Sequence, residues 1–74
     1  MTKVPQFTYK DLIKKLRKAG FQFDRQAKGS HEIWYNPFTK KRTIVPNHSG
    51  TISKSTLSAI IKQTGYNPDD FLNI

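Results

Sequence analysis

The sequence predicts an α+β domain in which helices cover one face of a small antiparallel sheet. Apolar residues recur at helical spacing near the start of the chain and again near its end, whereas the middle alternates with a period of two. A chain of 74 residues is long enough for one small domain, so we expect residues 1–74 to form a single domain. The absence of cysteine excludes disulfide scaffolds, thiol catalysis and cysteine-based zinc fingers.

A first helix is predicted from Thr8 to about Ala19. Thr8 is a good N-cap residue, and Asp11 three residues later completes a capping box. Gly20 is expected to end the helix. Helical spacing predicts one buried face, which consists of Tyr9, Leu12, Ile13, Leu16 and Ala19.

Three strands are expected to follow, over residues 21–26, 30–35 and 41–45. The first connection is a turn at residues 27–29, and the second is a longer turn that opens with Asn36 and Pro37. Short connections between successive strands imply an antiparallel meander. Pro46 ends it, because proline has no N–H to donate to the sheet.

A second helix is predicted to begin near Ser53 or Ser55, both good N-cap residues, and to end at Gly65. A short third helix is expected after it, because Asn67 is a cap residue and Pro68 suits the first helical position. The buried side of the second helix is expected to consist of Leu57, Ile60 and Ile61.

Alternation along the second strand predicts which side chains face the helices. Because Glu32 is charged, we expect it to stay in water, so that Ile33 faces the helices. His31 would then lie at the edge of the covered face, near the amino end of the second helix, where free N–H groups bind phosphate. Trp34 would lie on the open face, either stacking on a base, contacting a protein or simply covering the sheet.

The charge of the chain points to a polyanionic partner. It has 13 Lys and Arg against 5 Asp and Glu, a net charge of +8 that lies entirely within residues 1–50. Nucleic acid, an anionic membrane surface and an acidic protein all fit this charge. The first residues contain no apolar run typical of a signal peptide or membrane span, so we expect a cytoplasmic protein.

The segment from Arg25 to His31 contains the residues best suited to chemistry. A glycine turn exposes N–H groups, a hydroxyl follows, and the histidine has cations before it, which suits a phosphate held beside a proton-transfer group. His48 follows the third strand and is expected at the same end of the sheet, so the two histidines form a candidate base and acid for cleaving RNA through its 2′-OH. A packed or surface histidine is the alternative at position 31, and a loop hydrogen bond at position 48.

Other chemistry is poorly supported by the sequence. The acidic residues are scattered over different elements, and none has metal-ligand spacing with a histidine. The chain has no glycine loop of the type that binds ATP or NAD. We therefore expect neither a metal nor a cofactor.

Taken together, several short motifs resemble the HicA toxin family, the small mRNA interferases of HicA–HicB toxin–antitoxin modules. The resemblance covers roughly residues 8–66. The motifs that carry it, in chain order, are Gly20-Phe21, Arg25-Gln26, Gly29-Ser30-His31, Val45-Pro46 with His48, Thr56-Leu57, Ile60, Gln63 and Gly65.

This resemblance implies a fold like that of double-stranded-RNA-binding domains, in the order α-β-β-β-α. It also implies translation-independent cleavage of mRNA with His31 as the catalytic residue, and a HicB-type antitoxin that masks the active site. Together with the charge and the turn, it gives candidate RNA contacts at Arg25, Lys28, Gly29, Ser30 and Trp34, and a possible acid or phosphate contact at His48.

Two departures from the family pattern and two alternatives remain. Glu32 stands where the family often has His or an apolar residue, and we expect its carboxylate to favour a protonated His31. Ser55 stands where glycine is usual, and it preserves the start of the helix. The alternatives are a non-catalytic RNA-binding module of the same fold and a basic docking surface for an acidic protein.

Overall fold

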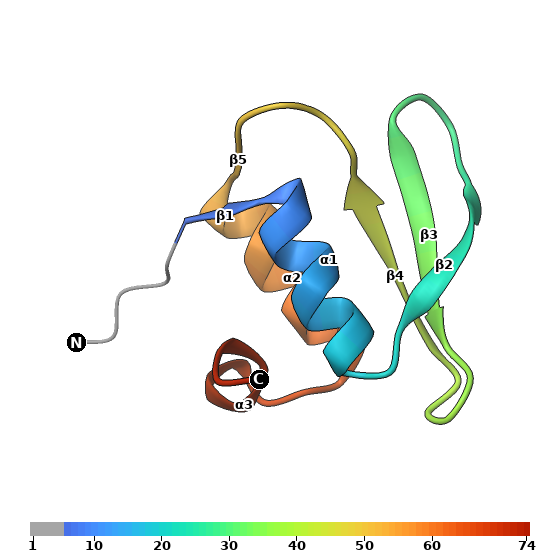
Figure 1. The fold of residues 1–74 in the computed structure, drawn as a ribbon, viewed down its shortest axis with the longest axis vertical. Coiled ribbons are helices and arrows are strands. Elements are labelled where there is room, and N and C mark those ends of the chain that lie inside the picture. Colours follow the sequence, from blue (N-terminus) through green and yellow to red (C-terminus); the bar gives the residue numbers. More distant parts are fainter. Residues whose placement is uncertain (1–5) are drawn as a thin grey trace.

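A helix, a three-stranded antiparallel sheet and two further helices follow one another in the computed structural model, which describes residues 6–74 (Figure 1). This order confirms the predicted α+β class and is consistent with the topology of double-stranded-RNA-binding domains. The elements are β1 Phe7–Thr8, α1 Tyr9–Lys18, β2 Gln22–Gln26, β3 His31–Asn36, β4 Lys41–Pro46, β5 Thr51–Ile52, α2 Lys54–Thr64 and α3 Pro68–Leu72.

The start of α1 has the predicted capping box. The Asp11 amide donates to Thr8 Oγ1 over 3.3 Å, and Asp11 Oδ2 accepts from the Thr8 amide over 3.1 Å. The hydrogen bonds from the backbone and side chain of Thr8 lower the pKa of the Asp11 carboxyl. Leu12 and Leu16 on the predicted apolar face are fully buried, so both the capping and the face of α1 are confirmed.

Glycine is required where α1 turns into the sheet. Gly20 has a φ of +99°, and a Cβ there would lie 3.0 Å from Nδ2 of Asn36. That amide group donates to the Ala19 carbonyl over 3.1 Å, which fixes the end of the helix against the end of β3.

The sheet has the strand order β2-β3-β4, and both pairs are antiparallel. Figure 1 shows the helices on one side of this sheet, so its other face is open. A bulge in β2 between Phe23 and Arg25 shifts the pairing with β3 by one residue. As a result Phe23 pairs with Trp34, and Arg25 pairs with Ile33.

The prediction of which side chains of β3 face the helices is wrong. Glu32, Trp34 and Asn36 are the buried side chains, whereas His31 is exposed at the start of the opposite face. The physical reason is that Glu32 finds hydrogen-bond donors inside the protein, so burying it is less costly than leaving the large indole of Trp34 in water. His31 therefore does not lie at the edge of the helix-covered face.

The second helix also follows its predicted signals. Ser53 is its N-cap and Gly65 its left-handed C-cap, with a φ of +80°. The short helix α3 begins after Asn67, whose side chain accepts from the Asp69 amide over 2.9 Å. The hydrophobic core comprises Phe7, Leu12, Leu16, Ala19, Phe21, Trp34, Val45, Ile52, Leu57, Ile60, Ile61 and Phe71.

One pairing was not predicted. The two-residue strands β1 and β5 pair antiparallel, with Phe7 opposite Ile52, and both side chains are buried. This pairing holds the start of α1 beside the start of α2 (Figure 1). No helix within residues 6–74 is long and apolar enough to span a membrane. The expectation about a leader segment concerns residues that lie largely outside this range.

Candidate active site

His31 is the first residue of β3 and follows a tight turn that connects it to β2. The Ala27 amide donates to the His31 carbonyl over 2.8 Å, and the His31 amide donates to the Lys28 carbonyl over 3.2 Å. The Gln26 side chain donates to the carbonyls of Gly29 and His31, each over 3.0 Å. These bonds fix the backbone on which the imidazole is carried, while the His31 side chain remains exposed.

The turn presents two free amides next to His31. Within the part of the chain that the structure describes, the N–H groups of Gly29 and Ser30 donate to no other residue. Gly29 has a φ of +64°, and a Cβ there would meet nothing within 4 Å, so the turn requires glycine for its conformation and not for space. Free amides in such a turn are suited to binding an anionic oxygen.

Two of the predicted cations lie at the same end of the sheet. Lys28 is exposed in the turn itself. Arg25 pairs with Ile33 on the open face; its side chain is 67% exposed and lies 3.7 Å from the carboxylate of Asp24. This ion pair is solvent-exposed and therefore weak, so it does not prevent Arg25 from contacting a phosphate.

The structure brings the second histidine to the same end of the sheet, as expected. Pro46 pairs with His31, and the Asn47 amide donates to the Ser30 carbonyl over 2.9 Å, so His48 follows immediately after this contact. The His48 imidazole is exposed, and its Nδ1 lies 3.3 Å from the Ser49 carbonyl.

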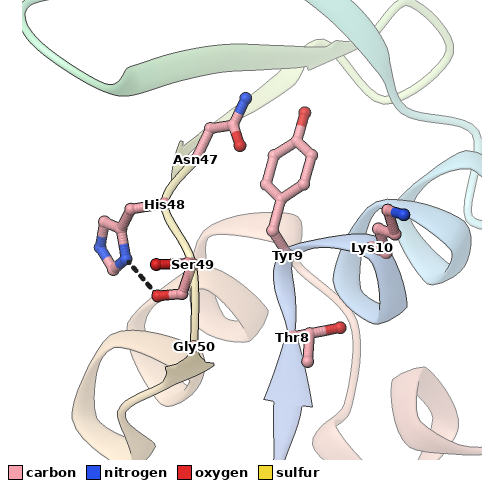
Figure 2. A pocket seen from close by; sticks show the side chains of 7 residues that line it. All are labelled: Thr8, Tyr9, Lys10, Asn47, His48, Ser49 and Gly50. Carbon is pink, nitrogen blue, oxygen red and sulfur yellow. Dashed lines mark hydrogen bonds between the residues drawn. The ribbon is translucent and has the colours of Figure 1, made fainter.

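A cavity of about 510 Å³ lies between the first residues of α1 and the loop that carries His48 (Figure 2). In Figure 2 the His48 ring points away from the loop on one side, and Lys10 lies beyond Tyr9 on the other. Both basic residues line the cavity, but they lie on opposite sides of it.

The residue that follows His31 in the sequence is Glu32, and its carboxylate is buried. Glu32 is 5% exposed, and its Oε1 accepts from Tyr9 Oη over 2.6 Å and from Trp34 Nε1 over 3.0 Å. Its Oε2 accepts from Asn47 Nδ2 over 2.8 Å. The network joins the start of α1, the middle of β3 and the start of the His48 loop, and sequence reasoning missed it.

The network determines the ionisation of its members. Burial acts to raise the pKa of the Glu32 carboxyl, but the hydrogen bonds from Tyr9, Trp34 and Asn47 outweigh it and lower the pKa overall. Burial, together with the hydrogen bond to this carboxylate, raises the pKa of the Tyr9 hydroxyl to about 12. Glu32 therefore holds its charge on the helix side of the sheet, where its partners are Tyr9, Trp34 and Asn47, whereas His31 lies on the opposite face.

Trp34 is a correction to the predicted RNA contacts. Only 1% of it is exposed, its ring centroid lies 6.1 Å from that of Phe23 in an edge-on arrangement, and the Arg17 guanidinium lies 5.5 Å from the ring. The ring belongs to the core, because the strand alternation that buries Glu32 also buries Trp34. No base can stack on it.

Within residues 6–74, no three His, Asp or Glu side chains are grouped as metal ligands would be. The expectation that the chain acts without a metal stays a prediction.

The sequence was compared with models of known protein families. The family described as HicA toxin of bacterial toxin-antitoxin matches residues 9–66. The chain belongs to the HicA toxin family. Comparison with curated protein sequences finds no match.

As a HicA toxin, the protein is one member of a toxin–antitoxin pair, so a HicB antitoxin is its partner. The matched residues include His31, His48 and every member of the Glu32 network. They do not include α3, whose buried Phe71 completes the core in this chain.

Proposed function

We propose that this HicA toxin is an mRNA interferase of a type II toxin–antitoxin system, a cytoplasmic endoribonuclease that cleaves mRNA without a metal and arrests translation. The observation that carries the proposal is the position of His31, exposed at the start of β3 next to the free amides of Gly29 and Ser30. A proton-transfer group and an anion-binding turn are the two components that cleavage of RNA through its own 2′-OH requires.

His31 acts as the general base in this proposal. Its neutral imidazole removes the proton from a 2′-OH, and the resulting oxygen attacks the adjacent phosphorus. The bond from phosphorus to the 5′-oxygen of the next nucleotide breaks, and that oxygen takes a proton from His48 or from water. The products are a 2′,3′-cyclic phosphate and a new 5′-hydroxyl end.

The surrounding groups stabilise the charge that develops on the phosphate. The N–H groups of Gly29 and Ser30 are free to donate to a phosphate oxygen, and Arg25 and Lys28 supply exposed positive charge nearby. The substrate provides its own nucleophile, so a small protein without a deep pocket is sufficient for this reaction.

The antitoxin is proposed to inhibit by covering His31. The imidazole lies on the open side of the sheet, where no element within residues 6–74 shields it. A bound protein on that side would exclude mRNA directly.

The test is cleavage of a labelled single-stranded RNA by the wild type and by His31→Ala, each with and without EDTA. The proposal predicts cleavage by the wild type in EDTA and none by His31→Ala. Loss of wild-type cleavage in EDTA that Mg²⁺ restores would contradict the metal-free mechanism. Binding of RNA by both proteins with cleavage by neither would instead identify a non-catalytic RNA-binding module.

A further inference from the structure

The open face of the sheet carries a second group of residues in line with His31. Side chains on one face of a strand alternate, so Ile33 and Tyr35 lie on the same face of β3 as His31. Their partners in β4 are Ile44 and Arg42. In Figure 1 all three helices lie on one side of the sheet, and the burial pattern of β3 places these residues on the other side, which no element within residues 6–74 covers.

Two features of this face are unusual for a surface without a ligand. Ile44 is 49% exposed beside the half-buried Ile33. The guanidinium carbon of Arg42 lies 4.7 Å from the centroid of the Tyr35 ring, so the cation covers the aromatic ring. We call Tyr35 and Arg42 the stacking pair, because guanidinium and aromatic planes are the surfaces on which unpaired bases stack.

The charges on this face favour a polyanion. Arg25 lies opposite Ile33, between His31 and the stacking pair along the sheet, and Arg42 lies opposite Tyr35. The carboxylate of Glu32 is buried on the other face, and Asp24 at the β2 bulge is the acid in contact with Arg25. A negatively charged chain along β3 therefore meets two arginines in succession.

We propose that single-stranded RNA binds along the open face of the sheet, with the reacting phosphate at His31 and a base farther along the strand on the stacking pair. Tyr35 is four residues from His31, a distance of about 13 Å along β3. A single nucleotide does not span that length, so the ligand is an oligonucleotide segment. The inference rests on the proposed function for the position of the reacting phosphate, and on the face itself for the rest.

The antitoxin of the proposed function has to cover only the His31 end of this face, and the rest of the face fits a protein partner less well than RNA. Its apolar part consists of two isoleucines and one tyrosine, whereas a stable protein interface covers about 800 Å² per partner around an apolar centre. The stacking pair lies on the same face of β3 as the candidate catalytic His31. A guanidinium stacked on an aromatic ring in this position suits a chain of bases and phosphates better than it suits a protein surface.

The first test is an NMR titration of the full chain carrying His31→Ala with a single-stranded RNA of about 10 nucleotides, a length typical of single-stranded binding sites. The inference predicts amide shift changes at Ile33, Tyr35, Arg42 and Ile44. Changes confined to the exposed lysines of α1, with no shift changes on the open face, would overturn it. Because the titration reports binding and not cleavage, this result and the outcome of the cleavage test are distinguishable.

The second test measures the dissociation constant for the same RNA in the same His31→Ala background. Loss of one stacked base weakens binding by about fivefold or more, which we expect for both Arg42→Gln and Tyr35→Leu. The matched control is Lys62→Gln on α2, which removes the same charge from the other side of the sheet and changes the constant by less than about twofold. Equal weakening by Arg42→Gln and Lys62→Gln would contradict a specific site, because it indicates diffuse charge attraction.

Discussion

Polar side chains on the two faces of β3 differ in whether the protein itself satisfies their hydrogen bonds. On the helix side, Glu32 accepts three hydrogen bonds and Asn36 both donates to Ala19 and accepts from the turn that follows. On the open side, His31 starts the strand exposed, and Tyr35 has a cation stacked on its ring. The same six residues therefore build both the core and the candidate site.

Polar groups whose hydrogen bonds are made within the protein stabilise the fold, whereas polar groups without such partners can bind a ligand. A buried carboxylate with three donors stabilises the fold and is already fully used. An exposed imidazole beside free amides has interactions left for a ligand. Substitutions on the helix side should therefore change stability, and substitutions on the open side should change activity.

The largest effect is expected from Trp34→Ala. Removing a fully buried indole leaves a cavity and takes away one of the two donors to Glu32 Oε1, at a cost of about 3–5 kcal/mol in the free energy of unfolding. For a domain of this size such a loss removes most of the stability. Urea unfolding followed by circular dichroism measures it. The aromatic control is Phe38→Ala, which is 87% exposed and should change stability by less than about 0.5 kcal/mol. Similar losses in both variants would contradict the assigned faces.

A smaller loss is expected from Glu32→Gln. The amide oxygen of Gln can still accept from Tyr9 and Trp34, but the amide nitrogen that replaces Oε2 cannot accept from Asn47. The variant therefore loses a hydrogen bond made to a charged group and the charge that strengthens the other two, at a cost of about 1–3 kcal/mol. The control is Asp24→Asn, whose exposed ion pair is worth at most about 0.5 kcal/mol. A Glu32→Gln protein as stable as Asp24→Asn would show that the network is not a structural element.

The same network should make the stability of the protein depend on pH at both low pH, through Glu32, and high pH, through Tyr9. Because the folded protein lowers the pKa of Glu32, its contribution is complete above the ordinary value of about 4.3 and is lost as the pH falls below it. Because folding raises the pKa of Tyr9 to about 12, its contribution is complete below pH ~10 and is lost as the pH rises through ~12. Unfolding measured across pH should show a shallower acid limb in Glu32→Gln and a shallower alkaline limb in Tyr9→Phe. Unchanged limbs would contradict these shifts.

The smallest change in stability is expected on the open side. His31→Ala removes an exposed side chain and should change the free energy of unfolding by less than about 0.5 kcal/mol. Arg42→Gln also removes the exposed contact with the Tyr35 ring and should cost less than about 1 kcal/mol. The same denaturation experiment measures it. A loss above 1 kcal/mol in either variant would show that these residues are structural, and would end the division between the two faces.

Local signals in the sequence predicted most of the fold. Each helix cap forms bonds only with residues a few positions away in the chain, so the capping roles follow from the sequence alone. The capping residues are Thr8 with Asp11, Ser53, Gly65 and Asn67. The pairing of β1 with β5 was missed, because two residues are too few for any periodic pattern.

The orientation of β3 was not predictable in the same way. The donors that allow Glu32 to be buried come from Tyr9, 23 residues earlier, and Asn47, 15 residues later. Only the folded chain brings them together. The large apolar area of Trp34 was the one signal in the sequence that favoured the correct alternation. His31 was predicted from its turn motif together with the family resemblance, and its role stays a prediction, whereas the pairing of Tyr35 with Arg42 required the register of the sheet.

The most direct test of the central claim is an analysis of the RNA ends that the wild type and His31→Ala produce in EDTA, with both proteins first shown to be equally stable. The account predicts 2′,3′-cyclic phosphate and 5′-hydroxyl ends from the wild type and no cleavage by His31→Ala. Equal cleavage by His31→Ala, or cleavage by the wild type at a linkage that lacks its 2′-OH, would contradict the assignment of His31 as the base that activates that hydroxyl.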